Sequence, residues 1–133
     1  MRARAVPATL LVGYTLFLAW ILLNPSPAVA GETVNHVASL LQRLGLPAAL
    51  VAAGRVEFLL NAAMFAPLTM LTTLIWPRRS WTHWVAWAFV LSAAVELSQG
   101  LVLPSRSAQF VDVVANTLGA LGGAGAMSLA VRA

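Results

Sequence analysis

The sequence predicts an all-helical integral membrane protein: a polytopic bundle of four transmembrane helices with a short amphipathic helix in its long first loop. Hydrophobic residues make up 60% of the 133 residues and charged residues only 9%, whereas soluble domains carry about 25% charged residues. The apolar residues also gather in four long stretches, each near the roughly 20 residues that a helix needs to cross a bilayer. We therefore exclude a water-soluble domain and expect residues 1–133 to form a single membrane domain.

The first predicted span covers about residues 6–23. It follows two Arg residues and is closed by a polar, proline-containing segment. The small residues at 28–30 would also suit the end of a cleaved signal peptide, but the apolar run exceeds the roughly 7 to 15 residues of a signal-peptide core. We favour a retained helix, and cleavage would leave the orientation of the other three spans unchanged.

A short amphipathic helix is predicted within residues 24–55, the longest connection. Apolar side chains recur there at the spacing of one helical face, at Val37, Leu40, Leu41 and Leu44. Polar side chains share the opposite face, at His36, Ser39 and Arg43. Such a helix can lie in the membrane interface or pack across the mouth of a bundle, and the pattern fits both places.

The second and third predicted spans cover about residues 56–76 and 81–103. Pro67 lies in the middle of the second span, where it lacks a backbone donor and leaves the carbonyl of Ala63 free, so a kink is expected. The third span begins with Trp81 and Trp84, which are typical of an aromatic anchor at the membrane interface.

The fourth predicted span covers about residues 110–131 and is rich in small residues. Gly119 and Gly123 are spaced one helical turn apart, a pattern that lets another helix approach closely. We expect this face to be a contact surface and a candidate site for homo- or hetero-oligomerisation.

The distribution of basic residues predicts the orientation in the membrane. With four spans, one side carries Arg2, Arg4, Arg78, Arg79 and Arg132, and the other side carries Arg43, Arg55 and Arg106. The richer side is expected to be cytoplasmic, which places both termini inside the cell. The Arg residues are scattered and not clustered along one face, so we expect no nucleic-acid partner.

Polar side chains within the spans converge on one side of the membrane. They are Glu57 and Asn61 on the second span, Ser92, Glu96 and Gln99 on the third, and Asp112 and Asn116 on the fourth. Burying such groups is costly, and the direction of each span places all of them in the extracytoplasmic half. Arg106, in the loop between the last two spans, lies at the same level. The sequence thus predicts a polar pocket open to the outside.

Each of these residues also has a simpler interpretation. Glu57 and Asp112 lie near the starts of their helices, where the helix dipole favours negative charge, and the amides could only join helices. Glu96 lies toward the end of its helix, where the dipole offers no such gain. No metal site is predicted, because His36 and His83 fall on opposite sides of the membrane and there is no Cys. No cofactor is predicted either, and Tyr14 is interpreted as packing.

Several motifs follow one another in a fixed order. They are NAAMFAPL from Asn61 to Leu68, SAAVELSQ from Ser92 to Gln99, then Arg106, Asp112 and NTLG from Asn116 to Gly119. Over residues 56–125 this order resembles the VanZ-like family of bacterial multi-pass membrane proteins. The family usually has Gly after Pro-Leu where this chain has Thr69.

The resemblance implies a bacterial inner-membrane protein with a role in the cell envelope. The founding member is associated with resistance to teicoplanin, and the matching site positions here are Asn61, Pro67, Glu96, Gln99, Arg106, Asp112 and Asn116. We expect the pocket to bind or shield a cell-wall precursor lipid or a lipoglycopeptide. Two alternatives stay open. One is an intramembrane enzyme that uses Glu96 or Asp112 with Arg106, and the other is a small helper subunit that packs against other membrane proteins.

Overall fold

Five α-helices make up the described part of the chain. The structure is a computed structural model that describes residues 2–24, 26–102 and 109–132. The helices are α1 (Arg2–Leu22), α2 (Pro27–Arg43), α3 (Ala53–Ile75), α4 (Trp81–Val102) and α5 (Phe110–Ala130), and the described residues contain no strand. The predicted all-α fold class is confirmed.

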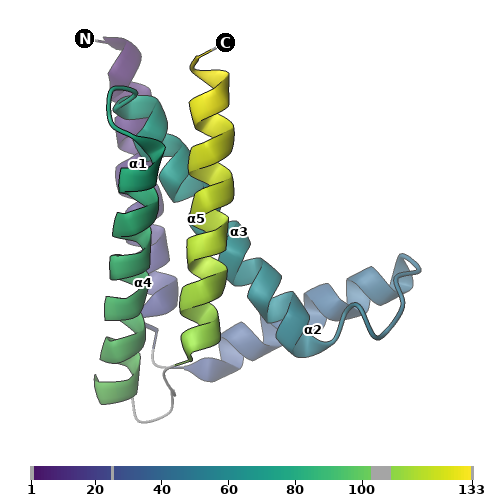
Figure 1. The fold of residues 1–133 in the computed structure, drawn as a ribbon. Coiled ribbons are helices and arrows are strands. Elements are labelled where there is room, and N and C mark those ends of the chain that lie inside the picture. The colour runs from purple at the N-terminus through teal and green to yellow at the C-terminus, as the bar shows by residue number, and fades with distance from the viewer. Residues whose placement is uncertain (1, 25, 103–108, 133) are drawn as a thin grey trace.

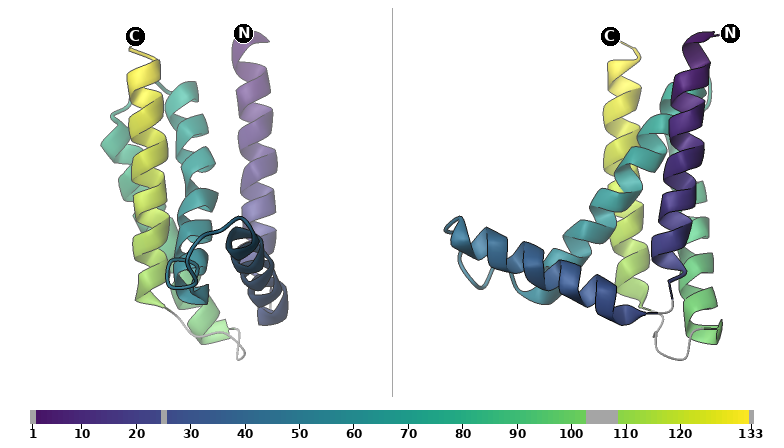
Figure 2. Two further views of the ribbon diagram at one scale, coloured as in Figure 1. Left: turned by 90° about the vertical axis from the view of Figure 1, so that its right-hand side faces the viewer. Right: turned by 180° about the vertical axis from the view of Figure 1, so that it is seen from behind.

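Four of these helices are long and apolar enough to cross a membrane. They are α1, α3, α4 and α5, and they coincide with the four predicted spans. Figures 1 and 2 show α1, α4 and α5 running along one direction, with α3 crossing them obliquely. The start of α1 and the end of α5 lie at the same end of the bundle. We call this end the termini end and the opposite one the α2 end.

The helix α2 leaves the bundle sideways, nearly across the direction of the spans (Figure 1). It begins at Pro27 and so is longer than the predicted amphipathic segment. Proline suits the first position of a helix because its fixed φ fits and no backbone partner is lost there. Val34 on α2 packs with Val51 and Val56 in a small apolar cluster against the start of α3, which fixes where α2 joins the bundle.

The predicted glycine face is the contact between α3 and α5. A Cβ atom added to Gly119 would overlap the backbone carbonyl of Ala62, and one added to Gly123 would overlap that of Ala66. Thr69 strengthens this contact, since its hydroxyl donates to the carbonyl of Ala120 at 2.9 Å. The expectation that this face joins two chains is therefore corrected: α3 of the same chain occupies it.

Pro67 lies inside α3, which stays helical on both sides of it. Tyr14 on α1 does more than pack, because its hydroxyl donates to the carbonyl of Met64 at 2.7 Å. That carbonyl directly follows the Ala63 carbonyl, which loses its usual partner to the proline. The Tyr14 hydroxyl thus ties α1 to α3 one residue after the carbonyl that the proline frees.

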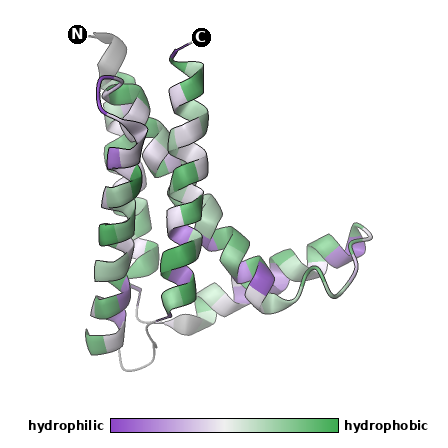
Figure 3. Ribbon diagram, viewed as in Figure 1, coloured by the Kyte–Doolittle hydropathy of each residue, from purple (hydrophilic) through white to green (hydrophobic). Residues whose placement is uncertain are grey.

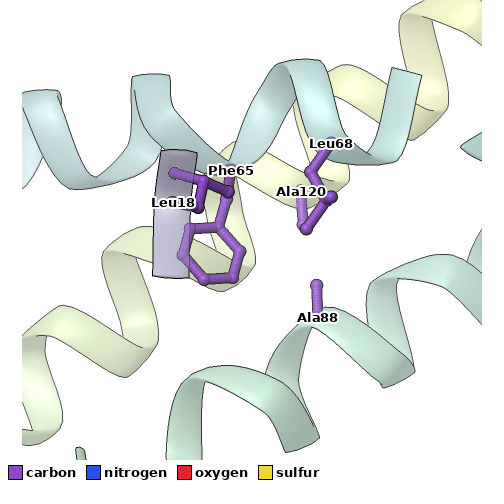
Figure 4. Close-up of a cluster of buried hydrophobic side chains, with 5 residues drawn as sticks. All are labelled: Leu18, Phe65, Leu68, Ala88 and Ala120. Carbon is purple, nitrogen blue, oxygen red and sulfur yellow. The ribbon is translucent and has the colours of Figure 1, made fainter. Parts of the chain in front are cut away.

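A compact apolar core joins all four spans at mid-bundle. It consists of Leu18 from α1, Phe65 and Leu68 from α3, Ala88 from α4 and Ala120 from α5, shown in Figure 4. Phe65 is fully buried. In Figure 3 the hydrophilic positions of α3 and α5 lie mostly between this core and the α2 end. The core thus separates the half of the bundle that holds the carboxylates and side-chain amides from a half whose buried polar side chains are the hydroxyls of Thr69, Thr73 and Ser128.

Candidate functional site

A cavity of about 340 Å³ lies at the α2 end, and all five helices or their ends contribute to its wall. Its polar side contains six of the eight residues predicted to gather at the pocket: Glu57, Asn61, Glu96, Gln99, Asp112 and Asn116. Ser92 does not line the cavity but is buried behind Asn116, to which it bonds, and Arg106 lies outside the described residues. The structure therefore brings together, around one space, the polar side chains that the sequence placed on three separate spans.

The polar side chains are arranged by depth. In α3, Asn61 follows Glu57 by one turn, and in α5, Asn116 follows Asp112 by one turn, which is a step of about 6 Å at 1.5 Å per residue. Both helices run away from the α2 end. The helix α4 runs the opposite way, so that Ser92 lies deepest on it. The polar wall extends inward as far as the apolar core.

Two hydrogen bonds between side chains tie the three helices together. Asn61 donates through Nδ2 to Oδ1 of Asp112 at 2.8 Å, which joins α3 to α5. Asn116 donates through Nδ2 to Oγ of Ser92 at 2.8 Å, which joins α5 to α4. Asn116 is only 3% exposed, and its Oδ1 has no hydrogen-bond partner among the described residues.

Glu96 holds the start of α5 in place. Its Oε2 accepts a hydrogen bond from the backbone N–H of Gln109 at 2.8 Å, and Gln109 is the residue that caps α5. A carboxylate gains energy at a helix N-terminus. Glu96 lies at the end of α4, where that helix's dipole offers no gain, but it also lies at the start of α5, whose dipole does favour it. Glu96 therefore has a structural role of its own, in addition to any contact with a ligand.

Gln99 joins the end of α1 to α4, because its Nε2 donates to the carbonyl of Leu22 at 2.5 Å. Glu57 differs from these residues. It is half-buried in the cavity wall and makes no side-chain hydrogen bond or ion pair with a described residue. Glu57 and the Oδ1 of Asn116 are therefore two polar groups of the wall for which the described residues supply no hydrogen-bond partner.

The apolar side of the cavity comes from parts of the chain for which sequence reasoning named no site residue. It consists of Trp20, Ile21 and Leu22 at the end of α1, Val29, Ala30 and Val34 on α2, and Leu60 and Met64 on α3. The signal for α2 was present in the sequence, since Pro27 after the extended Ser26 favours a helix start. Among the described residues no three His, Asp or Glu side chains are placed to share a metal ion.

Comparison with known families tests the resemblance that the motifs indicated. A family model described as VanZ/LLP1 matches residues 11–131. The chain belongs to the VanZ-like family. The match reaches beyond residues 56–125, so α2 and most of α1 are also part of the VanZ-like region. No curated protein and no solved structure matches the chain.

Proposed function

We propose that this VanZ-like protein binds the polar head of an amphiphilic, lipid-linked ligand of the cell envelope in the cavity at the α2 end. The observation that carries the proposal is the composition of that cavity. One side consists of carboxylates and amides from α3, α4 and α5, and the other is mainly apolar, with side chains from α1, α2 and α3 among which Asn24, Ser26 and Thr33 are polar. A wall with these two characters suits a ligand that has a polar head and an apolar tail.

The size and shape of the cavity support binding. Its volume of about 340 Å³ falls within the range of about 300 to 1,000 Å³ typical of ligand pockets. At its inner end the cavity meets the apolar core, because the lining residues Leu22 and Met64 also pack against it. The carboxylates and amides of the wall all lie on one side of this core, which favours binding or shielding over transport across the membrane.

The orientation follows from charge. Arg78, Arg79 and Arg132 lie at the termini end, whereas Arg43 and Arg55 lie at the α2 end. The sequence adds Arg2 and Arg4 to the first group, and the side richer in Arg is cytoplasmic by the positive-inside rule. We therefore propose that both termini are cytoplasmic in the bacterial inner membrane and that the cavity is open to the extracytoplasmic side.

Because the founding member of the family is associated with resistance to teicoplanin, we further propose that this binding protects the cell against the glycopeptide. The test is teicoplanin susceptibility of a sensitive bacterial host that expresses the chain. We expect the wild-type chain to protect the host and Glu57→Leu and Asp112→Asn to lose protection at equal membrane abundance. Glu32→Leu is the matched control, since Glu32 is exposed on α2 and does not line the cavity. Absence of protection by the wild-type chain, or equal loss in the Glu32 control, would refute the resistance role.

A further inference from the structure

We infer that the cavity selects a neutral headgroup rich in hydroxyls, a glycosyl or polyol head of a membrane lipid. The inference rests on the proposed function and adds the chemical class of the ligand. Three features of the wall carry it: an unused buried amide group, an unused carboxylate and a partly exposed indole ring.

The unused amide group belongs to Asn116. Its Nδ2 is taken by Ser92, and its Oδ1 has no partner among the described residues. A buried polar atom without a partner lowers stability, so a ligand that supplies the missing hydrogen bond binds more tightly. If the amide were turned over, Ser92 could donate to Oδ1 and the NH₂ group would be left instead. A hydroxyl both donates and accepts, so it satisfies Asn116 in either orientation.

The unused carboxylate is that of Glu57, nearer the α2 end than Asn116. A carboxylate only accepts hydrogen bonds, and bonds to a charged acceptor are the stronger ones. Glu57 and Asn116 lie at different depths and on different helices. A ligand that reaches both residues needs hydrogen-bond donors at several points of its headgroup. A sugar ring or a polyol has them, whereas a headgroup with a donor at one end does not.

The third feature is Trp20, which lines the cavity at the end of α1 and is 64% exposed. Indole offers a flat apolar face with a polar edge, and the C–H face of a sugar ring packs well on such a surface. The cavity also has a matching size. At about 30 Å³ per water-sized group, 340 Å³ holds about 11 such groups, close to one hexosyl head and too few to hold two acyl chains as well.

The test measures binding of lipids with identical acyl chains to the purified full-length chain by native mass spectrometry. The probes are monoglucosyl-diacylglycerol, diacylglycerol, phosphatidylethanolamine and phosphatidylcholine. We expect the glucosyl lipid to bind about tenfold more tightly than diacylglycerol, a difference of about 1.4 kcal/mol. Equal binding of these two, or a preference for phosphatidylethanolamine, overturns the inference and leaves the proposed function standing. Failure of every lipid to bind overturns both.

Variants separate a hydroxyl ligand from a cationic one. Glu57→Gln keeps an acceptor oxygen and is expected to retain most of the glucosyl-lipid affinity, whereas Glu57→Leu lowers it about tenfold. Trp20→Leu is expected to lower it by several-fold. The matched controls are Glu32→Leu and Trp87→Leu, two exposed residues outside the cavity wall. Loss of affinity in Glu57→Gln equal to that in Glu57→Leu, or equal losses in the controls, contradicts the inference.

Discussion

Replacing Gly119 by Ala tests the α3–α5 contact on which the cavity depends. The added Cβ would overlap the carbonyl group of Ala62, a backbone group of α3 that cannot rotate away. The two helices must therefore separate or shift along each other. Since Asn61 on α3 bonds to Asp112 on α5, such a shift also strains the polar wall of the cavity.

The magnitude follows from the kind of atom that the methyl group meets. Overpacking a well-packed interior costs about 1 to 3 kcal/mol, and because the atom here is backbone we expect about 3 kcal/mol. Gly122→Ala is the matched control on the same helix, since a Cβ there meets no heavy atom within 4 Å. Ala is favoured over Gly in a helix by about 0.8 to 1 kcal/mol. Both variants gain this helix preference, so it cancels between them, and they should differ in unfolding free energy by the overpacking cost of about 3 kcal/mol.

The assay is reversible unfolding of each variant in mixed detergent micelles by increasing SDS, followed by helical circular dichroism and by fluorescence of the five Trp residues. We expect Gly119→Ala to unfold at lower SDS than the wild type and Gly122→Ala at the same or higher SDS. Equal stability of the two variants would show that α3 does not occupy this face. A change in oligomeric state at unchanged stability would instead support the contact between chains.

Two further hydrogen bonds between helices give smaller, measurable effects in the same assay. Tyr14→Phe removes the bond to the carbonyl of Met64 and should cost about 0.5 to 1.5 kcal/mol; unchanged stability would mean that the hydroxyl adds nothing to the contact between α1 and α3. Thr69→Val removes the bond to Ala120 and should cost about 0.6 kcal/mol, the average for such bonds in a membrane protein; no loss would mean that shape alone holds this contact.

The spans and the convergence of polar residues could be read from the sequence because both follow from the bilayer. Its thickness sets the length of the apolar stretches, and the cost of burying polar groups forces Glu57, Asn61 and Asp112 to face inward. The direction of each span then sets their depth by simple counting. Span length and depth do not depend on which helices are neighbours, and Glu57, Asn61 and Asp112 do line the cavity.

What the sequence could not supply depends on neighbours in space. The spacing of Gly119 and Gly123 predicts a close helix contact but not which helix makes it, and α3 of the same chain does. The start of α2 at Pro27 places apolar side chains in the cavity wall, whereas the apolar periodicity alone indicated only the later part of that helix.

The polar residues of the cavity divide into two groups, and a loss of function caused by mutation must be interpreted differently in each group. Glu96 and Gln99 each bond to the backbone of another segment, the start of α5 and the end of α1. Loss of function in their variants can therefore come from a displaced helix as well as from a lost ligand. Glu57 bonds to no described residue, so its replacement alters the cavity with the least effect on helix positions. A functional defect in Glu57→Leu at normal abundance and stability is for this reason stronger support for a ligand than any defect at Glu96.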